Sequence, residues 1–396
     1  MRTTMFVICL SLLLVGVAPA ADSLNVRLIG CCDTPGTALR VAMTGNYAYV
    51  ADYDSGLRVI SVADPAHPVE VGHCNTPGWA MGVAAVGDFA YVAGLDSGLR
   101  VVSVSNPAHP IEVGHHSTPP RALGVAVSGA YACVASESTG LRIISVSDPA
   151  HPAEVGRYNT PYAAIGVAVA GNYAYVADYD SGLRVISVAD PAHPVEVGHC
   201  STPTRALGVA VNNACAYVAD ESSVRIISVS DPAYPVEVGH YDTRGEARVV
   251  AASGDYVYIP DSYVGLRVIS VADPEYPDEV GFYYTPGDAC GVAVMGDYAY
   301  FADGNAGLGV YQFYGAGVEE MPSAEVQIAS PMPTIVRGVL RLSSSPLTPN
   351  CSLLSIDGRK AAELHAGAND VSHLAPGVYF VHEAQAQLVR KVIISK

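Results

Sequence analysis

The chain has 396 residues, a formal net charge of −17 at neutral pH, and hydrophobic residues at half of its positions. Its 38 glycines, 27 prolines and 24 tyrosines predict many short strands separated by turns. A body this acidic repels nucleic acid and anionic lipid surfaces, so neither is expected as a partner.

The first twenty residues read MRTTMFVICLSLLLVGVAPA, with one basic residue, an apolar run and the small-residue motif Ala18-Pro19-Ala20. This order predicts a secretory signal peptide over residues 1–20. The apolar run of about fifteen residues is shorter than the roughly twenty that cross a bilayer. We therefore expect an exported mature chain without a transmembrane segment, either secreted or held at the outer-membrane surface.

An internal repeat dominates the next part of the chain. Residues 45–74 recur unchanged at 171–200, and an Asp-Pro or Asn-Pro step recurs with spacings of 42, 42, 42, 41 and 42 residues. The first residues of these steps are Asp64, Asn106, Asp148, Asp190, Asp231 and Asp273. A strict period of this length is typical of solenoids, propellers or arrays.

Each repeat predicts four short strands, which is the content of a β-propeller blade. In the first copy the expected strands are Ala38–Met43, Tyr47–Ala51, Leu57–Val62 and Val69–His73. The segment 24–36 aligns with 68–78 as an extra fourth strand, while the last copy stops after its third strand at 308–313. We predict an all-β, seven-bladed propeller over residues 21–315, whose ring the N-terminal strand closes.

The repeated motif GLRVISVADPAHPVEVG, which first occurs at residues 56–72, resembles the LVIVD repeat of secreted bacterial and archaeal propeller-like proteins. The resemblance covers about residues 24–315. It implies the propeller fold and an extracellular or surface location, and little about activity.

The period breaks at residues 316–327, which we interpret as a linker before a small Ig-like β-sandwich at 328–396. Three segments of this tail resemble the type A C-terminal sorting domain of the type IX secretion system: 330–333, 354–360 and 374–396. The matching positions include Asp357, Gly358, Arg359, Gly377, Tyr379 and Lys391. The resemblance implies export by outer-membrane secretion machinery, with departures such as Pro331-Met332-Pro333 in place of Pro-Asn-Pro.

Recurring polar residues have structural interpretations. The histidines follow the period, so they diverge around a ring and no metal site is expected. The Asp52-Tyr53-Asp54-Ser55-Gly56 segment lacks the later ligands of a calcium loop and is interpreted as a turn. The recurring arginines that begin with Arg58 are expected to pair with aspartates of the same blade. The cysteines are interpreted mainly as small apolar fillers, although disulfides stay open.

Sequence variation between copies gathers on one face of the predicted ring. The loops from fourth to first strands carry Thr37, Trp79, Arg121, Ala163, Arg205, Glu246 and Asp288, with Tyr162 beside Ala163. The turns from second to third strands carry Tyr53, Leu95, Glu137, Tyr179, Glu221, Tyr263 and Asn305. We hypothesise that this variable face binds the ligand, with drift in unconstrained loops as the alternative.

The main functional hypothesis is a non-catalytic module that binds an extracellular protein or glycan, without a cofactor. No catalytic constellation stands out in any single copy. The alternatives are an exported hydrolase or lyase acting on a glycan or lactone, and a purely structural surface protein. Fold alone does not choose among them.

Overall fold

The computed structural model describes residues 23–315 and seven strands between residues 334 and 394. The chain divides into two units, Met1–Val318 and Glu319–Lys396, described separately below. The predicted signal peptide and the predicted linker at 316–327 lie outside the described residues.

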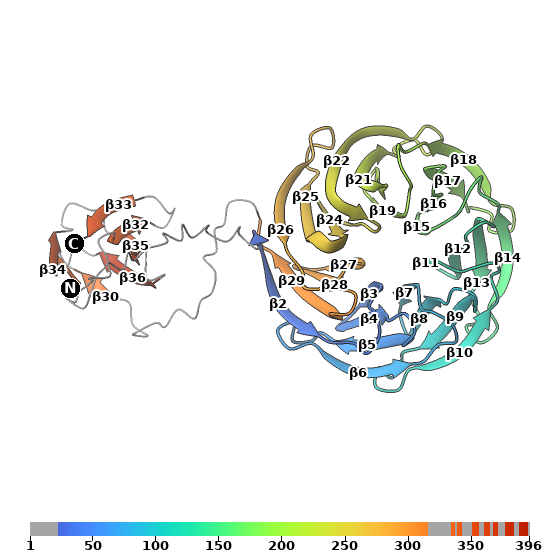
Figure 1. Cartoon of the computed structure of the whole chain (residues 1–396), viewed down its shortest axis with the longest axis horizontal. Coiled ribbons are helices and arrows are strands. Elements are labelled where there is room, and N and C mark those ends of the chain that lie inside the picture. Colours follow the sequence, from blue (N-terminus) through green and yellow to red (C-terminus); the bar gives the residue numbers. More distant parts are fainter. Residues whose placement is uncertain are drawn as a thin grey trace, which may run out of the picture. The chain divides into compact units, whose positions relative to one another are not determined.

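Within residues 23–315 the strands form antiparallel blades (Figure 1). In blades 1 to 6 the strands run in chain order from the centre of the ring outward, and in blade 7 the N-terminal β2 takes the outermost place. The first strands are β3 (Arg40–Thr44), β7 (Gly82–Val86), β11 (Gly124–Ser128), β15 (Gly166–Ala170), β19 (Gly208–Asn212), β23 (Ala251–Ser253) and β27 (Gly291–Met295). The second strands are β4 (Tyr47–Ala51), β8 (Phe89–Ala93), β12 (Tyr131–Ala135), β16 (Tyr173–Ala177), β20 (Cys215–Ala219), β24 (Tyr256–Asp261) and β28 (Tyr298–Ala302).

The two outer positions of each blade complete the sheets. The third strands are β5 (Leu57–Ser61), β9 (Leu99–Ser103), β13 (Leu141–Ser145), β17 (Leu183–Ser187), β21 (Glu221–Ser228), β25 (Gly265–Ser270) and β29 (Leu308–Phe313). The fourth strands are β6 (Val69–Cys74), β10 (Ile111–His116), β14 (Ala153–Tyr158), β18 (Val195–Cys200), β22 (Val236–Ala247), β26 (Asp278–Tyr283) and, for blade 7, β2 (Val26–Cys32). These bounds match the predicted strands of the first copy to within two residues.

The N-terminal strand completes the last blade, as predicted. β2 pairs antiparallel with β29, from Val26 opposite Phe313 to Cys32 opposite Leu308. The preceding β1 (Ser23–Leu24) pairs with β26, so one short segment joins blades 6 and 7. No single sheet closes on itself; the ring is completed by this pairing and by contact between β27 and β3.

The core lies between neighbouring sheets rather than in one central mass. At the seam of blades 1 and 2, Leu57 and Val59 pack with Ala90 and Val92, and all four are fully buried. Nearly continuous buried runs in the second and third strands, such as β4 and β5, fit this arrangement, because each blade is covered on both faces. The seam between blades 7 and 1 is built in the same way.

Blade 5 departs from the pattern. Its turn between second and third strands lacks the usual glycine and is one residue shorter, so β21 begins at Glu221. The next strand, β22, runs on to Ala247, which pairs with Asp261 of blade 6. Blades 5 and 6 are thereby linked into one sheet that also includes β1, and the short 3-10 helix η1 (Ser262–Val264) lies in the blade 6 turn.

The second unit has two sheets. One contains β30 (Thr334–Val336), β36 (Leu388–Ile394), β35 (Gly377–Glu383), β32 (Cys351–Ser355) and β33 (Lys360–Leu364), with β30 parallel to β36. The other pairs β31 (Val339–Leu342) with β34 (Gly367–Asp370). The all-β character agrees with the prediction, while the Ig-like sandwich stays a prediction.

Candidate functional site

Backbone hydrogen bonds organise the variable face. They join the turn between the second and third strands of one blade (the 2–3 turn) to the loop that leads from its fourth strand to the first strand of the next blade (the 4–1 loop). The Tyr53 carbonyl accepts from the Ala80 amide at 2.8 Å, and Tyr179 and Ala206 exchange two bonds of 3.1 and 2.9 Å. The turn residue adopts a left-handed backbone, with φ of 47° at Tyr53, 51° at Leu95, 40° at Glu137, 44° at Tyr179 and 69° at Glu221. This region is uncommon for residues with a side chain and costs about 1 kcal/mol each.

In blades 6 and 7 the left-handed turn position is held by Ser262 and Gly304, whereas the sequence analysis placed Tyr263 and Asn305 there. Gly304, with φ of 55°, bridges to Ala38, and the Ser262 carbonyl accepts from the Ala289 amide. Asp261 and Asp303 occupy the place of Asp52, which moves Tyr263 and Asn305 one position further along. Tyr263 lies in η1, and its side chain is outside the described residues.

Predicted aromatic residues of this face meet across blade boundaries. The Tyr53 and Trp79 rings stack with centroids 4.7 Å apart, and those of Tyr162 and Tyr179 stack at 5.8 Å. The Arg205 guanidinium lies 5.1 Å from the Tyr179 centroid. Trp79 and Tyr162 remain 48% and 52% exposed, so their rings stay available to a ligand.

The charged residues of the face form ion pairs. Arg121 lies 3.4 Å from Asp96 and 3.6 Å from Glu137, and Arg205 lies 3.4 Å from Glu221. Glu246 pairs with Arg248 at 2.6 Å. Asp288 is half-buried and makes no ion pair within the described residues, although it lies near Arg248 and Cys290.

Beneath this face a buried ionic network repeats from blade to blade. Arg58 lies 3.5 Å from Asp52 and 3.4 Å from Glu70, which is twelve residues further along. The predicted arginine–aspartate pair is confirmed in blades 1, 4, 5 and 6, while the glutamate was missed. Burial raises the pKa of Asp52, against the lowering effects of the Thr34 hydroxyl, the Gly36 amide and Arg58. Because the Asp52 carboxylate is occupied by Thr34, Gly36 and Arg58, the Asp52–Gly56 segment is a structural turn, as predicted.

Blade 7 keeps the aspartate without the arginine. Gly309 stands where the other blades have arginine, and a Cβ there would contact the Tyr311 ring at 2.5 Å. Asp303 is 2% exposed, and its Oδ1 has no hydrogen-bond partner in the described structure. Burial raises the pKa of Asp303, opposed by the Thr285 hydroxyl and the Gly287 amide.

The repeated histidines lie on exposed turns and outer strands of different blades. His67 lies 2.9 Å from Asp64 at an exposed turn, and His73 lies 3.4 Å from Glu70 on the outer strand. Within the described residues, no group of three or more His, Cys, Asp or Glu side chains could hold a metal ion. The cysteines of the described propeller are free thiols.

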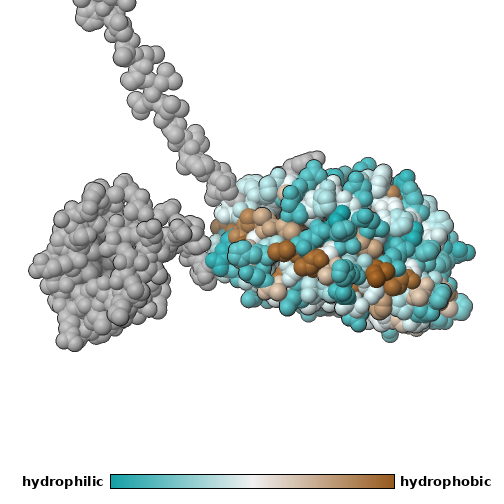
Figure 2. Space-filling view, turned by 90° about the horizontal axis from the view of Figure 1, so that it is seen from below, coloured by the Kyte–Doolittle hydropathy of each residue, from teal (hydrophilic) through white to brown (hydrophobic). Residues whose placement is uncertain are grey.

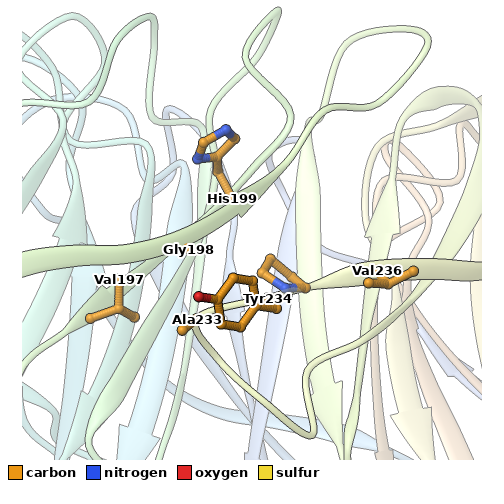
Figure 3. Close-up of a pocket in the computed structure, with 7 residues that line it drawn as sticks. Val197, Gly198, His199, Ala233, Tyr234 and Val236 are labelled. Atoms are coloured by element: carbon orange, nitrogen blue, oxygen red, sulfur yellow. The ribbon is translucent and has the colours of Figure 1, made fainter.

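The outer strands carry exposed apolar side chains, including Val69, Ile111 and Val195, which are 56%, 62% and 58% exposed. Figure 2 shows exposed apolar side chains on one side of this outer wall. A shallow groove of about 400 Å³ lies there between blades 4 and 5. Figure 3 shows Tyr234 in this groove below His199, with Val197 and Val236 on either side. The groove lies on the outer strands, away from the variable face.

Sequence reasoning also missed a charged group at the start of the innermost strands. Arg40 opens β3 and Arg248 immediately precedes the corresponding position of blade 6, close to Cys290 of blade 7. The sequence does contain a signal for Arg40, since the equivalent position is glycine in five of the other copies and arginine breaks that pattern.

The sorting-motif residues are partly described. Gly377 and Tyr379 lie on β35, and Lys391 on the neighbouring β36, opposite Phe380. Asp357, Gly358 and Arg359 fall outside the described residues. No helix of the described structure is long and apolar enough to cross a membrane.

Repeated four-stranded sheets in a ring define the class as a β-propeller repeat protein. The chain belongs to the LVIVD repeat family, whose repeat matches residues 35–76, 77–118, 121–160, 163–202, 204–243, 244–285 and 286–310. A comparison with curated proteins found no match.

Two similar solved structures agree on the fold. A chain of a mitotic checkpoint complex has a TM-score of 0.61 and 12% identity, with 79% of this chain and 100% of that chain covered. The computationally designed Ika8 protein has a TM-score of 0.53 and 8% identity, with 72% and 99% covered. At these identities the likeness concerns the fold alone.

Proposed function

We propose that this protein is a non-catalytic binding module that recognises an extracellular protein or glycan on its variable face. The observation that carries the proposal is the left-handed turn residue. Gly304 adopts this backbone without steric cost in blade 7. Blades 1 to 5 instead hold Tyr, Leu or Glu there, and costly backbone conformations concentrate at functional sites.

The side chains of this face suit recognition. Exposed tyrosine, tryptophan and arginine are the residues that most often anchor interfaces. The pairs of Tyr53 with Trp79 and of Tyr179 with Arg205 are ordered before a ligand arrives, which reduces the entropy lost on binding.

The chemistry near the centre of the ring argues against a cysteine nucleophile at Cys290. Burial is the largest cause that raises the pKa of the Cys290 thiol, to about 11. The thiol is therefore protonated at neutral pH, whereas a cysteine nucleophile needs the thiolate.

Export is part of the same proposal. The leader at residues 1–20 and the tail at 328–396 would carry the propeller through the inner and outer membranes. Mass spectrometry of the secreted or surface-bound protein should find an N-terminus at Ala21. A chain retained in the cytoplasm with Met1 intact would contradict this part of the proposal.

The binding proposal is tested by incubating the mature protein with a mixed array of glycans and proteins. Trp79→Ala and Arg205→Ala should each weaken binding to the best ligand at least tenfold. The matched control is Tyr276→Ala, since Tyr276 is 77% exposed on the opposite face. Undiminished binding by both variants, or equal loss in the control, would refute the assignment.

A further inference from the structure

The first residues of the innermost strands lie close together around the centre of the ring, at the end that belongs to the variable face. Each follows a 4–1 loop, and they are Arg40, Gly82, Gly124, Gly166, Gly208, Val249 and Gly291. A Cβ at Gly82 would lie 2.9 Å from the Leu123 carbonyl oxygen and 3.3 Å from the Gly124 Cα. Strands approach so closely there that glycine is favoured, which makes a long cationic side chain at this level exceptional.

Arg40 is held across the seam between blades 1 and 7. Its Nη1 donates to the Leu39 carbonyl and to the Cys290 carbonyl, both at 2.8 Å. The donors on Nε and Nη2 have no acceptor in the described structure. The guanidinium is thus positioned by backbone carbonyls, while part of its fork remains free to bind a ligand.

Arg40 also differs from the other arginines of blades 1 to 6, all of which pair with carboxylates. These are Arg58, Arg100, Arg121, Arg142, Arg157, Arg184, Arg205, Arg225, Arg244, Arg248 and Arg267. No carboxylate of the described residues lies within ion-pair distance of Arg40. A half-buried cation without a counterion is unfavourable, and an anionic ligand would relieve that cost.

The surroundings add a second cation. Burial, reinforced by the positive charge of Arg248, lowers the pKa of Arg40 to about 10, with Cys290 opposing. Arg248 is 45% exposed, is paired with Glu246 and lies near Asp288. Arg40 therefore carries an unpaired positive charge beside Arg248, on a protein whose net charge is −17, whereas Glu246 and Asp288 balance the charge of Arg248.

We propose that Arg40, supported by Arg248, binds the carboxylate of an acidic sugar residue in a glycan ligand. Planar guanidinium groups bind carboxylates through paired N–H donors, which gives both affinity and orientation. The same face offers half-exposed rings at Trp79 and Tyr162, whose flat apolar surfaces suit the neighbouring sugar rings of a chain. This inference rests on the proposed binding function and narrows its ligand class.

The test compares oligogalacturonate with a neutral oligogalactoside of the same length, by isothermal titration on the full mature protein. The wild type should bind the acidic oligomer at least tenfold more tightly at low salt, with a preference that falls as salt rises. Arg40→Gln should abolish the preference and leave affinity for the neutral oligomer unchanged. Arg157→Gln, at an exposed arginine on an outer strand, is the matched control and should keep the preference.

The outcomes separate this inference from the proposed function. If Trp79→Ala weakens both oligomers while Arg40→Gln keeps the acidic preference, the variable face binds glycans and the Arg40 site is overturned. Equal affinity of the wild type for both oligomers, binding of neither, or tighter binding of an aspartate-rich peptide would also overturn it. Should Arg40→Gln fail to fold, Arg248→Gln provides the second variant, with an expected partial loss of the preference.

Discussion

Replacing Arg267 tests the buried ionic network. Its side chain is 1% exposed, with Nε 3.7 Å from the fully buried Asp261 and Nη1 3.5 Å from Glu279. The guanidinium also lies 5.0 Å from the Phe282 centroid and 5.4 Å from that of Tyr284. Arg267→Met keeps most of the apolar stem but leaves a buried carboxylate uncompensated, which costs about 3–5 kcal/mol of unfolding free energy.

Blade 2 supplies the matched control, because Gly94 stands where blade 6 has the aspartate. Arg100 makes its ion pair with Glu112, at 3.1 Å, and donates from Nε to the Ser97 hydroxyl at 3.3 Å. The Glu112 carboxylate is 24% exposed. Arg100→Met should therefore cost only about 1 kcal/mol, near the value for a partly exposed pair. The two variants remove the same atoms at equivalent positions, so their difference reports the buried carboxylate together with the ring contacts of Arg267 with Phe282 and Tyr284.

Urea unfolding followed by circular dichroism measures both costs, provided that the slope m stays the same. Adding Asp261→Asn to Arg267→Met should recover a large part of the loss. Equal destabilisation by Arg267→Met and Arg100→Met would refute the reasoning, since packing alone would then explain both.

Three further predictions concern single features. Asp303→Asn should raise the melting temperature at pH 7, because it removes a buried carboxylate whose folded-state pKa is raised. The wild type regains this stability as the pH falls through the raised pKa and Asp303 becomes protonated, so the higher melting temperature of the variant should vanish near pH 4. A variant that melts lower at pH 7 would contradict this. Gly56→Ala, whose Cβ would lie 2.5 Å from the Cys74 carbonyl, should lower the urea midpoint more than Gly45→Ala, where nothing lies within 4 Å. Val26→Asp should speed amide hydrogen exchange across β29, and unchanged protection would argue against closure by β2.

Periodicity made the architecture predictable from sequence. The 42-residue spacing, the four strand segments of each copy and the extra strand at 24–36 made the blades and their completion predictable, because every blade repeats the same local sequence pattern. The merging of blades 5 and 6 was missed because it depends on how a turn one residue shorter lets β22 extend to Ala247.

The candidate site was only partly predictable. Variation between copies identified Trp79 and Arg205 as residues of one face, but not the ring contacts of Trp79 with Tyr53 and of Arg205 with Tyr179. Arg40 was overlooked because its distinguishing feature is the absence of a carboxylate within ion-pair distance, and sequence alone does not show which side chains lie near one another. The glutamates that begin with Glu70 were missed because a pair twelve residues apart has no local sequence signature.

The N-terminal strand that completes blade 7 affects how the propeller folds. Arg27 and Gln312 meet although 285 positions separate them along the chain. Such a distant encounter has a large entropic barrier and must await synthesis of nearly the whole repeat array. Until β2 pairs with it, the free edge of β29 is an open template for a foreign strand. A chain in transit would therefore benefit from a chaperone that masks this edge, and concentrated refolding should yield strand-exchanged dimers as its characteristic by-product.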